Sequence, residues 1–223
     1  MPARSWQIAL VIIAVAHLIG QWLGDRGLAD GTQVLLVPAV AGTVWSAAAL
    51  PRRAPATSAY GAALGFSWLG DWLPRFAGDQ HFVVLVACFL LAQICFILTF
   101  SLSSRRAPSW WAVTGYAAVF AALFLACRAG AGDLLPLVAL YGLLLVTTGA
   151  CATTVRPLVA GGAALFVLSD SLIALGQFRP GFDLPHHQVA VMATYIAAQI
   201  LIAYGLLQHR SRPARGATEP RRG

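Results

Sequence analysis

Long apolar runs separated by short polar breaks follow one another along the whole chain. A run of roughly 17–25 apolar residues is long enough to cross the hydrocarbon core of a bilayer as a helix, and the breaks carry Pro, Gly, Arg and Asp, as loops do. We therefore predict an all-α integral membrane protein with eight transmembrane helices. The predicted spans lie near residues 6–23, 33–50, 58–73, 80–101, 109–127, 132–151, 157–176 and 186–207.

The composition supports the same class of protein. The 223 residues are 59% hydrophobic and only 10% charged, whereas a soluble domain has about a quarter of its residues charged. The mean hydropathy is +0.74. The formal net charge of +7 does not indicate a nucleic-acid partner, because the arginines lie between the apolar runs and after the last one. We expect a transmembrane domain over residues 1–208 and a disordered basic tail over residues 209–223.

The arginines divide unevenly between the two sets of connections, and cytoplasmic loops are the ones enriched in Arg and Lys. This bias predicts a cell-membrane protein with both termini in the cytoplasm. Eleven arginines fall on the predicted inner side and four on the other. The inner set is Arg4, Arg52, Arg53, Arg105, Arg106, Arg156, Arg210, Arg212, Arg215, Arg221 and Arg222, and the outer set is Arg26, Arg75, Arg128 and Arg179.

Two carboxyl groups interrupt the apolar runs themselves. Asp71 lies in the run LGFSWLGDWL and Asp170 in AALFVLSDSL, and we expect every other acidic residue in a loop or in the tail. An ionisable side chain within a membrane span is costly and is by default a candidate functional residue. A buried Asp that only ties two helices together is the alternative for each of them.

The two aspartates belong to a pattern that occurs twice in the same order. The matching pairs are Pro38 with Pro136, Asp71 with Asp170, and Gln93 with Gln199, at offsets of 98, 99 and 106 residues. A shift of four helices keeps the same orientation, so the pattern predicts a parallel internal repeat. Its halves are residues 1–104 and 105–208, and helices 2–4 should superpose on helices 6–8 by rotation about an axis near the membrane normal.

Further polar side chains within the spans are candidates to support the aspartates. Gln93 and Gln199 are more typical of interhelical hydrogen bonds than of catalysis. No cysteine or histidine spacing indicates a metal site, and we expect no cofactor. The supporting candidates are Ser67, Ser169, Tyr141, Tyr195, Gln93 and Gln199.

Nearly the whole chain resembles the YhhN family, the membrane lysoplasmalogenases. The resemblance lies in LLVPAV, GFSWLGDWL, FLLAQICFIL, LPLVALYGLLL, GGAALFVLSDSLIAL and TYIAAQILIAYGLL. It implies hydrolysis of the vinyl-ether bond of lysoplasmalogens, a class of lysophospholipid, to a fatty aldehyde and a glycerophospho-head group. It also implies that the two family aspartates are Asp71 and Asp170 and that the neighbouring family serine is Ser169.

Three positions depart from the family pattern. Gln93 and Phe96 stand where a His and a Tyr are expected, and Val37 stands where a basic residue is expected before the proline. The role of that His therefore cannot be transferred to this chain, and its substrate could differ.

Two carboxyl groups suffice for vinyl-ether hydrolysis without a metal. A carboxyl in a low-dielectric site can hold its proton near neutral pH and act as the acid, and a second, ionised one can stabilise the resulting cation and position water. We assign the acid to Asp170, the deeper group, and the base or stabiliser to Asp71. A proton-coupled carrier of a small solute with one Asp per repeat, and a non-catalytic membrane protein, remain the alternatives.

The predicted topology can be tested directly. A reporter fused after Gly223 should score as cytoplasmic, because the arginine bias places both ends of the chain on the inner side. A periplasmic or extracellular signal would contradict the orientation, and a reporter fused after Gly130, between the fifth and sixth predicted spans, serves as the control for the opposite side.

Overall fold

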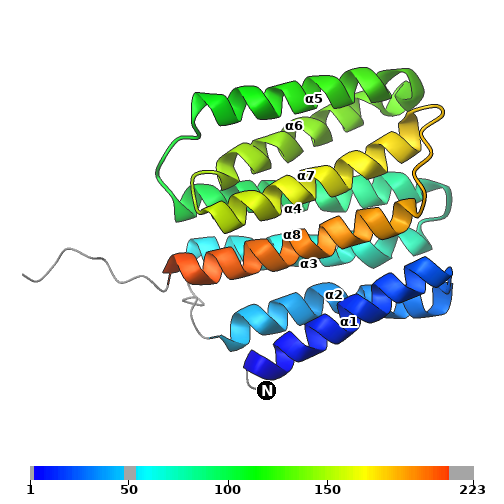
Figure 1. Cartoon of the computed structure of the whole chain (residues 1–223). Helices are drawn as coiled ribbons and strands as arrows, with labels where there is room; N and C mark the ends of the chain where they lie inside the picture. Colours follow the sequence, from blue (N-terminus) through cyan, green and yellow to red (C-terminus); the bar gives the residue numbers. More distant parts are fainter. Residues whose placement is uncertain (1–2, 48–53, 211–223) are drawn as a thin grey trace, which may run out of the picture.

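The structure, a computed structural model, describes residues 3–47 and 54–210, and this part of the chain folds into eight α-helices (Figure 1). They are α1 (Ala3–Leu23), α2 (Arg26–Ser46), α3 (Pro55–Trp72), α4 (His81–Ser103), α5 (Trp110–Ala131), α6 (Leu135–Ala152), α7 (Pro157–Phe178) and α8 (His187–Arg210). Three short 3-10 helices lie in the connections: η1 (Leu73–Phe76), η2 (Gly78–Gln80) and η3 (Gly132–Leu134).

The helices run side by side, with α1 and α2 at one edge of the bundle and α5 at the other (Figure 1). α3, α4, α7 and α8 lie between them and share one continuous apolar core. Two ends of the bundle can be distinguished. The end that carries the α1–α2, α3–α4, α5–α6 and α7–α8 connections is called the acidic end, because these connections contain Asp25, Asp79, Asp133 and Asp183. The opposite end is called the basic end.

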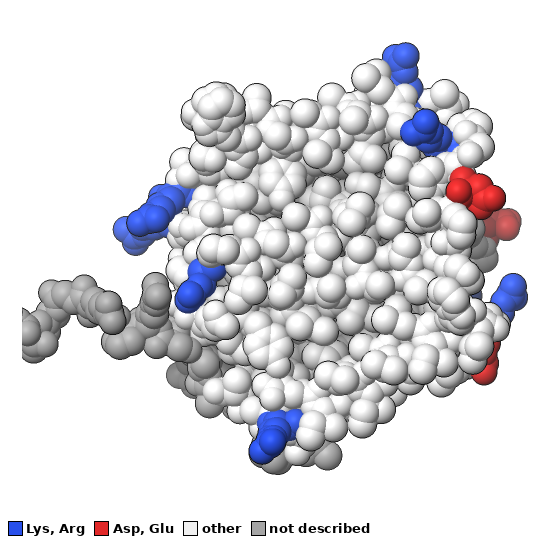
Figure 2. All heavy atoms as spheres, in the orientation of Figure 1, with Lys and Arg blue, Asp and Glu red and all other residues white. Residues whose placement is uncertain are grey.

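The surface of the bundle is that of a membrane protein. Figure 2 shows charged side chains at the two ends and an uncharged band between them. Large apolar side chains of α1 and α5 point outward, among them Ile12, Trp22 and Leu125, each more than half exposed. Within the described residues, six continuous helical stretches are long and apolar enough to cross a membrane. The prediction of an all-α, multi-pass membrane protein is therefore confirmed.

The number of crossings stays a prediction. One of the six stretches, Trp110–Ala152, contains both α5 and α6, and α3 is not among them. α3 is only 18 residues long and contains Ser, Thr and Gly residues as well as Asp71. It is instead covered by protein, since it packs against α2 and α4.

The start of the second helix differs from the prediction. α2 begins at Arg26 rather than near residue 33, and Asp25 caps it by accepting a hydrogen bond from the Leu28 N–H at 3.1 Å. Asp30 thus lies within a helix, so the expectation that every acidic residue besides Asp71 and Asp170 lies in a loop was wrong. The polar first turns of α2 are stable because they extend to the exposed acidic end, where Asp30 pairs with Arg75 at 3.2 Å.

Pro38 is accommodated inside α2 by a partner from another helix. A proline has no N–H, so the carbonyl four residues earlier, that of Val34, loses its usual partner within the helix. The indole Nε1–H of Trp68 on α3 donates to this carbonyl at 2.9 Å. The proline therefore creates a polar contact that holds α2 against α3.

The repeat and the tail remain predictions. In each half, helices that follow one another in the chain contact one another. The halves differ in the position of the first helix, because α1 contacts α8, whereas α5 contacts α7 and not α4. Superposition of the halves is not tested by these contacts. α8 continues to Arg210, and residues 211–223, like residues 48–53, lie outside the described part.

Close packing of α7 on α8 depends on a glycine and yields a stability prediction. A Cβ at Gly162 would lie 2.9 Å from the carbonyl oxygen of Ala198 and 2.9 Å from the backbone N of Ile202. Backbone atoms cannot move aside easily, so Gly162→Ala should destabilise the bundle by about 1–3 kcal/mol. Gly161→Ala is the matched control, because a Cβ there has no neighbour within 4 Å. Thermal denaturation in detergent should separate the two variants; equal midpoints would contradict this account of the interface.

Candidate active site near the acidic end

Both intramembrane aspartates are buried in the half of the bundle nearest the acidic end. Asp71 is 8% exposed and Asp170 is 7% exposed. Asp71 lies one residue before the end of α3, and Asp170 lies eight residues before the end of α7, which is about 12 Å along a helix. The two carboxyl groups are close enough to interact electrostatically. The structure therefore brings the two predicted catalytic residues into one region.

Each aspartate accepts a hydrogen bond from a tyrosine on another helix. The Tyr195 hydroxyl of α8 donates to Oδ2 of Asp71 at 2.9 Å, and the Tyr141 hydroxyl of α6 donates to Oδ2 of Asp170. Both tyrosines were predicted as support from the sequence, without a prediction of which aspartate each would contact. The pairing leaves the second oxygen of each carboxyl for another partner.

Gln93 and Gln199 extend this polar group toward the bundle centre. Gln93 lies beside Tyr141 and Asp170, and Gln199 lies beside Tyr195. Both are at most 1% exposed, yet neither amide makes a hydrogen bond of good geometry to another described residue. Buried polar groups are normally hydrogen-bonded. The unused hydrogen-bond donors and acceptors of these amides therefore lie near the aspartates, where a polar substrate group or water can bind them.

The two predicted serines behave differently from one another. Ser169 lies next to Asp170 in sequence, but its hydroxyl donates to the backbone oxygen of Val191 on α8 at 3.0 Å. This bond ties α7 to α8 instead of supporting the carboxyl. Ser67 lies one helical turn before Asp71, is fully buried and has no hydrogen-bond partner among the described residues.

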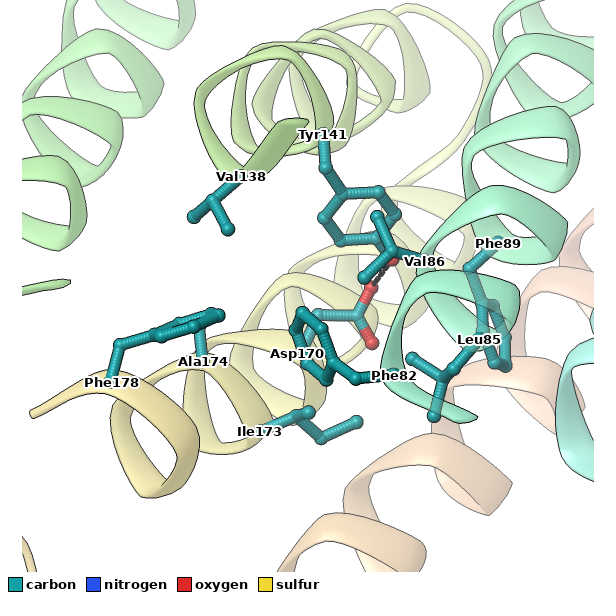
Figure 3. A pocket seen from close by; sticks show the side chains of 10 residues that line it. All are labelled: Phe82, Leu85, Val86, Phe89, Val138, Tyr141, Asp170, Ile173, Ala174 and Phe178. Atoms are coloured by element: carbon teal, nitrogen blue, oxygen red, sulfur yellow. Dashed lines mark hydrogen bonds between the residues drawn. The ribbon is translucent and has the colours of Figure 1, made fainter. Parts of the chain in front are cut away.

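Asp170 and Tyr141 line two apolar pockets (Figure 3). The first pocket lies between α4, α6 and α7 and is a small cavity of about 30 Å³. Tyr141 and Asp170 are its two polar members, and the rest of its lining is Phe82, Leu85, Val86, Phe89, Val138, Ile173, Ala174 and Phe178. In Figure 3 the Asp170 carboxyl lies among these side chains and is joined to the Tyr141 hydroxyl.

The second pocket lies between α5, α6 and α7, has a volume of about 50 Å³ and shares Val138, Tyr141, Asp170 and Ala174 with the first. Asp71 lines neither of these pockets. Asp170 thus borders two small apolar spaces. The lining side chains would have to move apart to admit a hydrocarbon chain whose polar end lies at Asp170.

An aromatic cluster connects the first pocket, which Phe89 lines, with Tyr195, which binds Asp71. The rings of Phe89, Phe166 and Tyr195 meet edge to face, with centroids 5.7–6.2 Å apart. Phe96, which replaces the tyrosine expected from the family, packs on Phe166 with ring centroids 5.6 Å apart and is fully buried. Phe96 thus belongs to the apolar core of this protein.

Two residues near Asp71 were missed from the sequence. Gln33 of α2 and Arg75 of η1 both lie near Asp71, and the guanidinium of Arg75 donates to Oε1 of Gln33 at 2.7 Å. The spacing of four between Asp71 and Arg75 could have indicated a shared helical face. Gln33 gave no such signal, because its approach depends on how α2 packs on α3. Within residues 3–47 and 54–210 no three His, Cys, Asp or Glu side chains are grouped so that they could hold a metal ion.

Comparisons with known proteins identify the family. The lysoplasmalogenase TMEM86A of Bos taurus is 46% identical over 54 residues, which are 24% of this chain and 22% of that protein. The chain therefore matches about a fifth of that relative's length. No solved structure matches the chain. The model of the YhhN family matches residues 28–206, which include every residue of the site described above. The chain belongs to the YhhN family.

Proposed function

We propose that the protein is a lysoplasmalogenase-like hydrolase that cleaves the vinyl-ether bond of 1-alkenyl lysophospholipids by acid–base catalysis with two aspartates. The observation that carries the proposal is the carboxyl of Asp170, which lies among apolar side chains next to a second buried carboxyl. Family membership and the name of the bovine relative support the substrate class. Neither a metal nor a cofactor is needed for this chemistry.

The apolar lining of the pockets suits the hydrocarbon chain of such a lipid. The vinyl ether joins a long hydrocarbon chain to a polar glycerophospho-head group. In the proposal the chain enters one of the apolar pockets, so that the double bond lies at Asp170 and the head group faces the acidic end. The Phe82 and Phe178 rings, which meet edge to face at 5.1 Å, stand at that end of the pocket.

Asp170 supplies the proton in the first step. Proton transfer from its carboxyl to the second carbon of the alkenyl chain converts the double bond to a single bond and leaves an oxocarbenium ion at the first carbon. The surrounding apolar side chains favour the neutral, protonated acid before the step. The Tyr141 hydroxyl donates to the carboxylate that remains after the step, and so lowers the free energy of the charged product.

Asp71 acts in the second step. Its carboxylate stabilises the oxocarbenium ion and accepts a proton from the water that attacks the first carbon, which gives a hemiacetal. Collapse of the hemiacetal breaks the bond to the glycerol oxygen, releases the fatty aldehyde and leaves the head group with a free hydroxyl. Gln93 and Gln199 have open hydrogen-bonding valences with which to hold this water.

The membrane arrangement completes the proposal. The protein lies in the cell membrane with both termini in the cytoplasm, all eight helices cross, and the two halves form a parallel repeat. The acidic end then faces outward and the pockets open toward the outer leaflet, so lysophospholipid reaches Asp170 from that leaflet.

Replacing either aspartate by asparagine should abolish turnover. Asn keeps the shape of Asp but can neither give nor take the required proton, so Asp71→Asn and Asp170→Asn should each lower kcat by a factor of about 100 or more. The double variant should be scarcely worse than either single one, because groups that act as a unit are not additive. The measurement is aldehyde release by purified protein from a 1-alkenyl lysophospholipid, with and without chelator.

The same assay separates the alternatives. Asp79→Asn at the surface is the matched control and should leave turnover unchanged. Full activity in one of the buried variants would reduce that aspartate to a helix tie. If the wild-type protein releases no aldehyde but moves a solute across vesicles in response to a proton gradient, it is a carrier and the hydrolase proposal is wrong.

The pockets predict selectivity for chain length. Ala174→Leu adds bulk where both pockets meet Asp170. Excluding two methylene groups of the lipid at ~0.8 kcal/mol each should raise KM for long alkenyl chains by roughly tenfold, with a smaller effect on short chains. Ala118→Leu on the exposed surface of α5 is the control. An equal effect on all chain lengths would contradict the assignment of these pockets to the alkenyl chain.

A further inference from the structure

A space that we call the polar hollow lies at the acidic end, apart from the two small pockets that border Asp170. Its volume is about 480 Å³, within the range of about 300–1,000 Å³ that small-molecule sites have. The first wall comes from residues between 20 and 30, at the end of α1 and the start of α2, and the second from residues 186–189 at the start of α8. The two walls come together because α1 and α2 both contact α8.

The first wall of the polar hollow contains both a cation and a carboxylate. Asp25 uses Oδ1 to cap α2, where it accepts from the Leu28 N–H at 3.1 Å, and its other oxygen has no partner among the described residues. Arg26 lies on the same lining, and its guanidinium pairs with no side chain in the described part of the chain. Both residues are exposed, so a ligand can reach a guanidinium and a carboxylate oxygen from water.

His186 belongs to the second wall and has an unusual backbone conformation. Its φ of 53° lies in the left-handed region, which residues other than glycine seldom adopt and which is found preferentially at functional sites. Its imidazole stacks on the indole of Trp22, with ring centroids 3.9 Å apart and ring planes 11° apart. The ring therefore lies against α1 and lines the polar hollow, on the same lining as Arg26.

Both walls are attached to the segments that carry the two aspartates. Asp30 of the first wall pairs with Arg75 at 3.2 Å, and Arg75 follows Asp71 by four residues. His187 of the second wall donates from Nε2 to the backbone oxygen of Leu172 at 3.0 Å, and Leu172 lies on α7, the helix of the second aspartate. The polar hollow therefore lies beside the candidate active site, at the acidic end.

We propose that the polar hollow binds the zwitterionic head group of a lysophospholipid, which consists of a phosphodiester and a primary ammonium group. Arg26 and the imidazole N–H of His186 donate to the phosphate oxygens, and the second oxygen of Asp25 accepts from the ammonium group. Hydrogen bonds that involve charged groups are stronger than those between neutral groups. The inference rests on the proposed function, which supplies the identity of the ligand, and it assigns a site to the part of the substrate that does not react.

Two simpler roles would use fewer of these groups. The stack of Trp22 on His186 could only hold α1 against α8, but this role uses neither the guanidinium of Arg26 nor the imidazole N–H. A site for free inorganic phosphate would use both of these donors, but the carboxylate of Asp25 on the same lining would repel the phosphate. The presence of both signs of charge favours a ligand that carries a cation as well as a phosphate.

Binding of soluble head-group compounds to the purified protein tests the proposal independently of catalysis. Glycerophosphoethanolamine carries the phosphodiester and the ammonium group, whereas glycerophosphoglycerol carries the phosphodiester only. In isothermal titration calorimetry, Arg26→Gln should raise Kd for both compounds about 10-fold, the effect of losing a hydrogen bond to a charged group. Asp25→Asn should raise Kd for glycerophosphoethanolamine alone, and it keeps the cap of α2 because Asn caps a helix as well as Asp does. Arg128→Gln at the exposed end of α5 is the control for loss of an arginine at the acidic end.

A variant of His186 separates ligand binding from the structural stack. His186→Phe keeps a ring that can stack on Trp22 but has no N–H to donate. It should raise Kd for both compounds about threefold to tenfold and leave the thermal midpoint in detergent unchanged. An unchanged Kd would remove His186 from the proposed site and limit it to the stack.

Aldehyde release should show the same dependence on the head group. Arg26→Gln should raise KM for a 1-alkenyl lysophosphatidylethanolamine about 10-fold with kcat little changed, because the contact is equally strong before and during the reaction. A 1-alkenylglycerol has no phosphate, so Arg26→Gln and wild type should hydrolyse it equally well.

Each outcome decides the proposal. If wild type is active and Arg26→Gln and Asp25→Asn keep its KM and its Kd values, the head-group site is wrong while the proposed function stands. Inorganic phosphate that binds as tightly as glycerophosphoethanolamine, with no effect of Asp25→Asn on either, would make the polar hollow a site for free phosphate and overturn the proposal. A wild-type protein that releases no aldehyde but binds glycerophosphoethanolamine through Arg26 and Asp25 overturns the proposed function and supports the zwitterion site.

Discussion

The cost of burying two carboxyl groups in a membrane bundle dominates the structure of this protein. Removing an isolated carboxylate from water costs many times the net stability of a domain unless it is hydrogen-bonded or takes up a proton. Asp71 and Asp170 meet this demand with tyrosines from α8 and α6. The requirement explains why the long side chains of Tyr195 and Tyr141 reach Asp71 and Asp170 from helices far away in the sequence.

The two aspartates do not have equivalent surroundings. Asp170 contacts apolar pockets and one tyrosine, whereas Asp71 lies nearer the polar acidic end, beside Tyr195, Gln33 and Arg75. Two nearby carboxyl groups cannot easily be charged together, and different surroundings decide which of them keeps the proton. The two aspartates therefore have different environments even though the sequence pattern around them is alike, and the proposed reaction uses one as the acid and the other as the carboxylate.

The class, the helices and the family could be predicted from the sequence because hydropathy and local motifs carry that information. Apolar runs located seven helices within a few residues of their ends, and family membership was confirmed. The start of α2 could not be predicted in this way, because its polar first turns have the composition of a loop. Arg75, which pairs with Asp30 in these turns, comes from a distant part of the chain. Ser169 was placed beside Asp170 by sequence, but a backbone oxygen of α8 determines where its hydroxyl points.

Gln93 stands where the resemblance to the family leads us to expect a histidine, and its surroundings bear on what that difference means. Gln93 lies beside Asp170 and Tyr141, and neither atom of its amide is bound. A histidine there could exchange a proton with Asp170, whereas an amide can only donate or accept a hydrogen bond. In the proposed reaction the acid then recovers its proton by another route, and the water that attacks the oxocarbenium ion is the nearest source. A proton passed from that water through Asp71 to Asp170 would close the cycle with no histidine, which is consistent with two carboxyl groups close enough to interact.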